Sequence, residues 1–200
     1  MKTIDKFYQN QIDIKKSQFI CRLYPVQTEK EAKEIIAKIS EEFKDATHNC
    51  SAYYVSDGEG YDDDGEPGGT AGRPMLNVLK KNELQNSVAI VTRYFGGIKL
   101  GAGGLVRAYS KSVLETLAIA EIVEMEKYEL FSFTFDYQHI KIVDSDLRAQ
   151  KIDIIDKNYD ANVTYIIATE NKERLDNLKE KLAKEVKIDY LGNKYLKKLQ

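Results

Sequence analysis

The spacing of hydrophobic positions in the first 125 residues predicts strands that alternate with amphipathic helices. Thr28 and Glu31 have the spacing of a helix capping box, and apolar residues follow at helical spacing as far as Phe43. A second helix could begin at Pro74. A third is marked by apolar residues on one face, namely Leu105, Tyr109, Val113 and Leu117. The predicted strands are Gln18–Leu23, Cys50–Ser56 and Ser87–Phe95, and the predicted loops are Asp57–Glu66 and Gly96–Gly104.

The last third of the chain predicts the order strand, helix, strand, strand, helix, strand, which is that of a ferredoxin-like split βαβ domain. The strands are Tyr128–Tyr137, Lys151–Ile155, Val163–Thr169 and Val186–Leu191, and the helices are His139–Ala149 and Lys172–Val186. Eleven of the twelve glycines lie between Gly58 and Gly104, so the two parts of the chain differ in construction. We therefore predict an α+β protein with a boundary near Met125–Lys127, giving domains of residues 1–126 and 127–200.

The composition is that of a globular protein, because 42% of the 200 residues are hydrophobic and 31% are charged. With a net charge of −2, nucleic-acid affinity would have to come from a local basic patch. No apolar run approaches the roughly 20 residues of a membrane span, and the first residues lack the apolar stretch of a signal peptide. The only cysteines, Cys21 and Cys50, are interpreted as buried thiols. These features predict a cytoplasmic protein without a membrane partner.

A segment without acidic residues, Asn86–Leu114, concentrates basic side chains around a glycine loop. Arg93 is expected at the end of a strand, Lys99 in the loop and Arg107 one turn into the following helix, where the three could converge on a phosphate. Lys111 follows one turn later. The glycines that would let backbone amides approach an anion are Gly96, Gly97, Gly101, Gly103 and Gly104. The alternative is that these glycines only permit a tight turn and close helix packing.

The glycine segment departs from the standard nucleotide-binding motifs. Val106 stands where the GxGxxG motif requires glycine, and Ala102 follows Gly101 where the P-loop requires lysine. Aromatic side chains in the segment could stack on bases if they are exposed, although core packing is expected for Phe95. These aromatic residues are Tyr94, Phe95 and Tyr109.

The acidic segment YDDDGEPGGTAGRP could in principle bind a divalent cation through Asp62, Asp63, Asp64 and Glu66. An EF-hand is excluded, because glycine would occupy its first ligand position and alanine its last. We favour a solvated acidic turn that caps the helix near Pro74, and we predict no metal. Thr70 lies in a glycine stretch that could form a second backbone nest, with Arg73 beside it.

His48, Asn49 and Cys50 are the residue types of a thiol protease. Neighbours on one strand cannot all converge, because successive side chains point to opposite faces. His48 and Cys50 share a face, and the favoured interpretation is a core cysteine beside a hydrogen-bonded histidine. The lysine-rich end, Lys179–Lys198, is interpreted as a solvated face, because acidic residues balance much of its charge.

Four segments, in order along the chain, resemble motifs of the IMPACT/YigZ family. They are KKSQFI (Lys15–Ile20), ATHNC (Ala46–Cys50), DDGEPGGTAGRP (Asp63–Pro74) and VTRYFGGIKLGAGGLVRAYS (Val91–Ser110), of which the last is the most specific. Two residues depart from the family pattern: Gln18 replaces the usual arginine, and Gly68 replaces the usual serine. Each departure removes a side chain that could contact an anion.

The resemblance implies a first domain similar to the second domain of ribosomal protein S five. It also implies a second domain similar to the C-terminal domain of elongation factor G. Both of those relatives contact ribosomal RNA or phosphate-rich ligands. Eukaryotic relatives act in translational control, partly through protein partners and through an extra N-terminal domain that has no counterpart here.

We therefore predict a protein that binds RNA or the ribosome, is linked to regulation of translation and uses no cofactor, with a translation factor or regulatory protein as a further partner. The predicted phosphate-contacting residues are Arg73, Arg93, Gly96, Gly97, Lys99, Gly101, Gly103, Gly104 and Arg107, with Asp63, Asp64, Glu66, Thr70, His48 and Lys111 as secondary candidates. Two alternatives stay open. One is an enzyme or binding protein for a small phosphorylated ligand, for which the sequence offers no evident general base or nucleophile. The other is a protein-interaction module.

Overall fold

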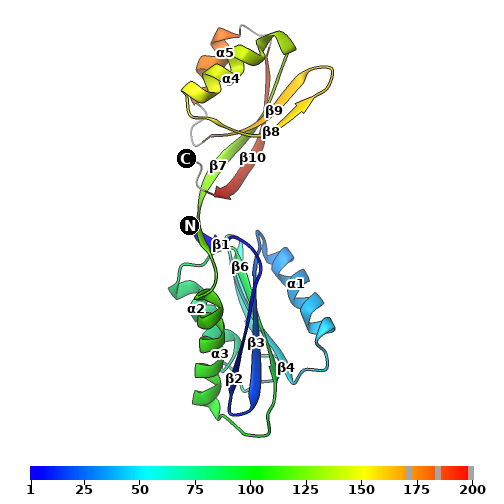
Figure 1. Cartoon of the computed structure of the whole chain (residues 1–200), viewed down its shortest axis with the longest axis vertical. Coiled ribbons are helices and arrows are strands. Elements are labelled where there is room, and N and C mark those ends of the chain that lie inside the picture. Colours follow the sequence, from blue (N-terminus) through cyan, green and yellow to red (C-terminus); the bar gives the residue numbers. More distant parts are fainter. Residues whose placement is uncertain (170–172, 183–185, 198–200) are drawn as a thin grey trace. The chain divides into compact units, whose positions relative to one another are not determined.

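The computed structural model describes residues 1–169, 173–182 and 186–197. The chain divides into two compact units, Met1–Glu124 and Met125–Gln200 (Figure 1). The division falls inside one strand, β7 (Ile122–Phe135), which begins six residues before the predicted start at Tyr128. The first three residues of β7 pair with β1 (Lys2–Ile4), and later residues pair with strands of unit 2.

Unit 1 is built on a five-stranded antiparallel sheet with the order β2-β3-β6-β4-β5. The strands are β2 (Tyr8–Ile14), β3 (Ser17–Pro25), β6 (Ser87–Tyr94), β4 (His48–Val55) and β5 (Gly58–Asp62). The two edge strands are absent from the sequence-based prediction. β5 lies inside the expected acidic loop, where the polar sequence GEGYD is extended because it pairs with β4.

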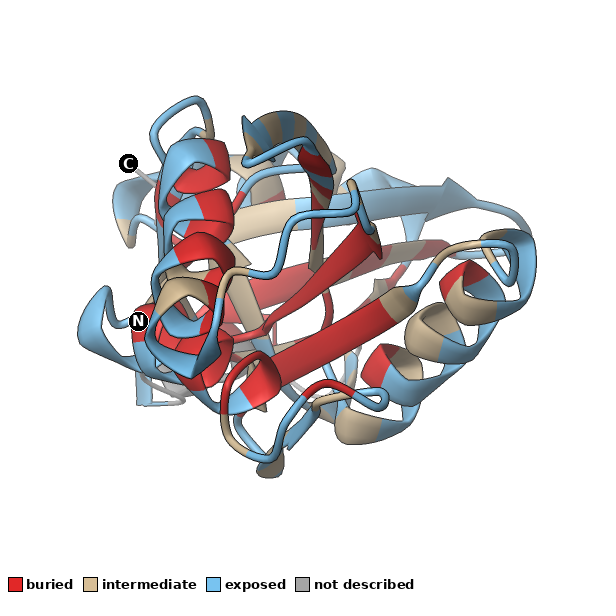
Figure 2. Cartoon of the chain, turned by 90° about the horizontal axis from the view of Figure 1, so that it is seen from below, coloured by how far each residue is buried: buried red, intermediate tan, exposed pale blue. Residues whose placement is uncertain are grey.

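Helices cover both faces of this sheet, as Figure 2 shows by the buried positions on the strands and on the inward sides of the helices. The helices are α1 (Glu29–Glu42), α2 (Gly72–Lys81) and α3 (Ala102–Leu117). On the central strand, Val88 and Ile90 belong to the hydrophobic cluster under α1. Ala89 and Val91 belong to the larger cluster under α2 and α3. Successive side chains of β6 point to opposite faces of the sheet, so each one packs into the cluster under α1 or into the cluster under α2 and α3.

The helix starts differ from one another. At α1 the hydroxyl of Thr28 accepts a hydrogen bond from the Glu31 amide, as the capping box predicts. The Glu31 carboxylate accepts from the Gln27 amide (2.7 Å), one residue before the amide that the motif expects. The third helix starts at Ala102, three residues earlier than predicted, so two of its glycines form the first turn.

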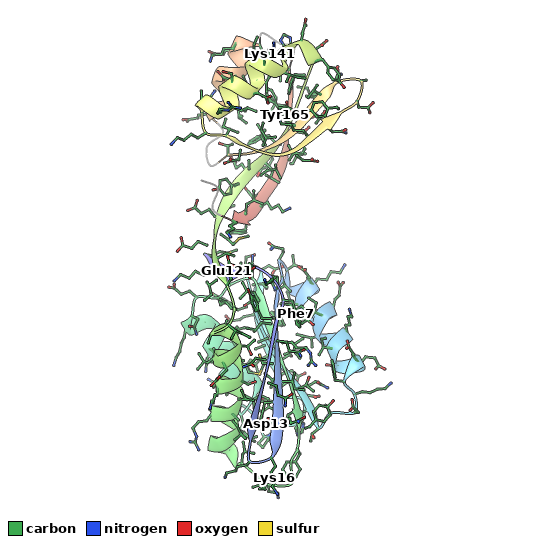
Figure 3. All side chains as sticks on the ribbon, in the orientation of Figure 1. Phe7, Asp13, Lys16, Glu121, Lys141 and Tyr165 are labelled. Atoms are coloured by element: carbon green, nitrogen blue, oxygen red, sulfur yellow. The ribbon has the colours of Figure 1, made fainter. Side chains whose placement is uncertain are left out.

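Unit 2 has, within the described residues, an antiparallel sheet with the order β10-β7-β9-β8. Its further elements are η1 (Tyr137–His139), α4 (Ile140–Ala149), β8 (Asp153–Tyr159), β9 (Val163–Thr169), α5 (Glu173–Lys181) and β10 (Lys187–Lys197). Both helices pack on one sheet face over aromatic residues such as Phe133 and Tyr165, the second of which Figure 3 labels. Of the predicted helix Lys172–Val186, residues 172 and 183–185 lie outside the described residues.

Two predicted strands of unit 2 differ in extent from the observed ones. β8 runs to Tyr159 rather than ending near Ile155, and a register shift between Ile154 and Asp156 interrupts its alternation of apolar and polar residues. β10 continues well past the predicted end at Leu191. Across the described part of the chain, no helix combines the length and the apolar character needed to cross a membrane.

The tip of the β2–β3 hairpin lies against the end of β6 in unit 1. Its two turn residues, Lys15 and Lys16, have φ values of 48° and 67°, as a tight two-residue hairpin turn requires. A Cβ atom on Gly96 would lie 1.9 Å from the carbonyl oxygen of Lys16. Glycine at this position therefore allows the hairpin backbone to touch the chain that leaves β6.

We predict that Gly96→Ala lowers the free energy of unfolding by about 1–3 kcal/mol or more, because a backbone carbonyl cannot move aside as a flexible side chain can. The measurement is urea unfolding followed by circular dichroism. Gly68→Ala is the matched control, since the Cβ that it adds has no atom of the described part of the chain within 4 Å. Equal stability of the two variants would show that the contact with Lys16 is not a constraint.

Candidate functional site

Arg93 is buried in an ion pair beneath the glycine segment. One terminal nitrogen of its guanidinium lies 2.6 Å from Oε1 of Glu66, and the other donates to the hydroxyl of Ser17 (3.3 Å). The arginine is only 5% exposed, because it continues the row of Ala89 and Val91 on the sheet face that α2 and α3 cover. The prediction that Arg93 joins Lys99 and Arg107 on a surface phosphate therefore needs correction: Arg93 is already neutralised inside the fold.

The same carboxylate oxygen of Glu66 accepts a second hydrogen bond, from the hydroxyl of Tyr109 on α3 (2.8 Å). The thiol of Cys50 lies 3.3 Å from that hydroxyl and 3.0 Å from the carbonyl oxygen of Asp63. Burial, reinforced by Cys50 and Glu66, raises the pKa of Tyr109, so its hydroxyl remains a donor. Tyr109 is thus a core residue, packed edge-on against Phe19, and it is not available to stack on a base.

His48 faces this network from the neighbouring strand, where it is paired with Arg93 in the β4–β6 register. Its Nδ1 atom lies 2.7 Å from the carbonyl oxygen of Asp64 and therefore carries a proton. Its Nε2 atom lies 3.8 Å from Oε2 of Glu66. Asn49 points to the other face, where its amide oxygen accepts from Thr92. The interpretation of a core cysteine beside a hydrogen-bonded histidine is confirmed.

The acidic turn holds the start of α2. The carboxylate of Asp63 accepts hydrogen bonds from the amides of Gly69 (2.7 Å), Ala71 (3.0 Å) and Gly72 (2.9 Å). The Asp64 carboxylate accepts from the backbone amide of Asn49. The capping interpretation is therefore confirmed for Asp63. Among the residues that the structure describes, no three His, Cys, Asp or Glu side chains are grouped closely enough to hold a metal ion.

Thr70 lies in the glycine stretch that could form a second nest, and Arg73 lies beside it. The Thr70 hydroxyl is buried and donates to the carbonyl of Pro67 (2.6 Å), so it is directed into the turn. Arg73 is exposed in the first turn of α2. Of these two candidates, only Arg73 is placed to meet a ligand from solution.

The remaining basic residues of the glycine segment lie at the surface. Lys99 is exposed in the loop and Arg107 is exposed on α3, and neither forms an ion pair with any described residue. A guanidinium nitrogen of Arg107 approaches the first turn of α3, 3.6 Å from where a Cβ on Gly103 would stand. Lys111 differs, because it faces Glu115 at 3.8 Å.

No side chain of the described residues compensates the first turn of α3. Its N-cap residue, Gly101, has a φ of 73°, no side chain bonds to the turn within the described residues, and the turn contains no acidic residue. The first amides of a helix lack partners within the helix and carry its positive dipole end. At α2 the carboxylate of Asp63 compensates this charge, whereas at α3 the amides and Arg107 together form a positive surface that no described acidic side chain compensates.

The glycines of the segment serve two purposes. Gly96 and Gly104 permit close packing, since a Cβ at Gly104 would lie 2.9 Å from the Leu100 side chain. Gly97 and Gly101 adopt positive φ values, and a Cβ at either would meet no atom of the described residues within 4 Å. The alternative explanation, that the glycines permit tight turns and close packing, thus accounts for these four glycines. It does not conflict with a ligand site, because the first amides of α3 stay accessible.

Sequence reasoning missed two contributions to this surface. The first is the Lys15–Lys16 turn, which the unpredicted strand β2 brings beside Gly96. Figure 1 shows the hairpin tip and the β6–α3 loop at the same end of unit 1, and Figure 3 labels Lys16 there. The second is Phe95, which is 46% exposed although core packing was expected. Both segments, KKS and YFGG, were visible in the sequence. Their proximity follows only from the register of the β2–β3 hairpin, which the sequence did not predict.

We predict that Glu66→Ala lowers the free energy of unfolding by about 3–5 kcal/mol, because it leaves Arg93 buried without its counter-charge. The control is Glu59→Ala, which removes a surface ion pair with Lys80 and is expected to cost less than about 1 kcal/mol. Both values come from urea unfolding at neutral pH. A loss at Glu66 no larger than that at Glu59 would contradict the structural role of the buried pair.

We predict that neither thiol of the folded protein reacts readily with Ellman's reagent at pH 8. Burial raises the pKa of Cys21 to about 12 and also raises that of Cys50, so the reactive thiolate is scarce. In urea both should react, because an unfolded thiol ionises near pH 8.5. Rapid labelling of one thiol in the native protein would contradict this burial.

The raised pKa values of the two thiols also make the folded state lose stability as the pH rises above about 8.5, because the unfolded chain then releases protons that the folded chain keeps.

The network and the glycine segment both lie within residues 15–117, which match the family model of the Impact N-terminal domain. The IMPACT family member YvyE of Bacillus subtilis is 45% identical over 174 residues, covering 86% of this chain and 80% of that protein. The IMPACT family member YigZ of Escherichia coli is 35% identical, with coverage of 78% and 79%. A crystal structure described only as a hypothetical protein aligns with a TM-score of 0.67 and 29% identity, covering 94% of this chain and 95% of that one. The chain therefore belongs to the IMPACT family.

Proposed function

We propose that this protein binds RNA, ribosomal or ribosome-associated, through the basic end of unit 1, in a cytoplasmic role connected with regulation of translation. We define the basic end as Lys15, Lys16, Lys99, Arg107 and the first turn of α3. Arg73 remains a further candidate contact. The observation that carries the proposal is the uncapped first turn of α3 beside two exposed cations that have no acidic partner among the described residues.

The chemistry of the basic end suits phosphate groups. Backbone amides at a helix start bind phosphate oxygens, and a lysine or an arginine side chain adds charge and hydrogen-bond donors. Contacts of this kind hold the sugar–phosphate backbone and carry no information about the bases. The binding that we propose is therefore largely independent of sequence and weakens steeply with salt.

The fold supports the same proposal. The strand order β10-β7-β9-β8, with α4 after β7 and α5 after β9, agrees with a ferredoxin-like split βαβ domain. We propose this assignment for unit 2 and a likeness to the second domain of ribosomal protein S five for unit 1. The link to translation, and a translation factor or regulatory protein as a further partner, come from what these likenesses imply, since fold by itself does not fix function.

We predict that the double variant Lys99→Ala, Arg107→Ala loses most of its affinity for a structured RNA, because two phosphate contacts disappear. The measurement is fluorescence anisotropy across a salt titration, in which the slope of log affinity against log salt should fall by about 1–2. The charge-matched control is Lys30→Ala, Lys38→Ala, which removes two exposed lysines of α1 from the opposite side of the sheet.

Equal losses in the two double variants would indicate attraction by overall charge and would contradict a defined site. If the wild-type protein binds no RNA at low salt, the proposed function is wrong. Lys15→Ala, Lys16→Ala, measured in the same series, tests whether the hairpin tip contributes. Its expected effect is a further decrease in the salt slope, with folding unchanged, since both side chains are exposed.

A further inference from the structure

Phe95 presents an aromatic ring at the surface directly after the buried residues of β6. Its backbone is fixed, because its amide donates to the hydroxyl of Thr47 (2.9 Å). Phe95 is 46% exposed, whereas Arg93, two residues earlier and inside β6, is 5% exposed. The side chain therefore has a fixed attachment and a large apolar area in contact with water.

The ring of Phe95 lies close to the buried guanidinium of Arg93. The guanidinium carbon of Arg93 lies 5.4 Å from the ring centroid of Phe95 and 5.4 Å from that of Phe19, within the range of cation–π contacts. Glu66 and Ser17 hold the guanidinium in place. The buried guanidinium is screened by water less than an exposed one would be, and the Glu66 carboxylate balances part of its charge, so the contact with the ring is mainly one of packing with a modest cation–π contribution. Phe95 is thus held as a preordered flat surface.

The surroundings of the ring distinguish it from an isolated exposed aromatic residue, which is common on protein surfaces. The next two residues are glycines, and a Cβ at Gly97 would lie more than 4 Å from every atom that the structure describes outside its own chain neighbours. Lys16 approaches from the hairpin, since a Cβ at Gly96 would lie 2.6 Å from its own Cβ. Lys99 follows in the same loop. The chain next to the ring is therefore uncrowded at Gly97, and two exposed lysines belong to the segments that adjoin it.

We propose that Phe95 is a stacking platform for an unpaired nucleobase, so that the ligand of the basic end is single-stranded RNA. This inference rests on the proposed RNA-binding function and narrows its ligand class. A base within a duplex is stacked on both faces and cannot lie on a surface ring, whereas an unpaired base can be splayed onto an aromatic side chain. The cations contact the neighbouring phosphates, and the ring selects strands whose bases are free.

The first test compares a single-stranded RNA of about 12 nucleotides with a duplex of the same length, a size within the range of known single-strand sites. Phe95→Ala should weaken single-strand binding about tenfold and leave the duplex affinity and the salt slope unchanged. The control is Phe7→Ala, which removes a ring of equal exposure (45%) elsewhere in unit 1. Phe95→Leu keeps an apolar side chain without a flat face, and it should bind the single strand as weakly as Phe95→Ala.

The second test exploits the absence of tryptophan from the sequence. Phe95→Trp introduces the single tryptophan at the platform, which can be excited at wavelengths that tyrosine does not absorb, and stacking on a base should quench its emission as the single strand is added. Tyr61→Trp places the fluorophore at another exposed aromatic position, 49% exposed on β5, and should show little change. Thermal unfolding of every variant checks that each is folded.

The outcomes separate this inference from the function on which it rests. If Phe95→Ala or Phe95→Leu binds the single strand as the wild type does while Lys99→Ala, Arg107→Ala does not, the platform is wrong and the RNA site stands. The platform is equally wrong if the duplex binds as tightly as the single strand and loses as much affinity on Phe95→Ala. If neither RNA binds the wild type, both ideas fall, and the exposed ring points to a protein partner.

Discussion

The ion pair between Glu66 and Arg93 is the interaction on which the arrangement of unit 1 depends. Two buried charges are costly unless their remaining hydrogen-bonding groups find partners. Here Ser17 and Tyr109 supply two of those partners and His48 lies alongside, while Nε of Arg93 has no hydrogen-bond partner among the described residues. These residues come from four segments that are far apart in the sequence. The family motifs therefore meet inside the fold, around one carboxylate, and much of what they specify is a buried network rather than a ligand surface.

Because Arg93 is used internally, the outward chemistry of the glycine segment comes from other groups. The two neighbouring helices α2 and α3 show the division clearly. The start of α2 receives the Asp63 carboxylate and is satisfied within the protein, whereas the start of α3 receives no carboxylate from the described residues. A positive helix end that the fold leaves uncompensated is available to an anion from outside. The two helices contact each other in one unit, so the difference between their starts reflects local structure and not the overall charge of the protein.

Local patterns in the sequence predicted the elements that local physics determines. The capping residue Thr28 and the apolar spacing after it define α1, and the β-branched run around Ile90 defines β6. The strand β5 was missed because its pairing with β4, not its composition, makes it extended. Arg93 was misplaced because its partner Glu66 lies 27 residues away, and alternation on β6 decides its face only when both helix layers are known. Phe95 was misplaced because its ring leaves the core one residue after the strand ends.

The buried Arg93 under the Phe95 ring and the glycine-containing loop that carries Lys99 have different consequences for binding. Arg93 is immobilised by Glu66 and by Ser17, so the ring above it need not lose much freedom when a ligand arrives. The loop that carries Lys99 contains Gly97 and Gly101 at positive φ. The long side chain of Lys99 can adjust to a flexible phosphate backbone. A flexible RNA strand has a regular phosphate charge and a variable conformation. One fixed contact to a base, together with several adaptable contacts to phosphates, suits such a ligand. On the function proposed here, the buried ion pair contributes to binding without touching RNA, because it fixes the surface on which a base would rest.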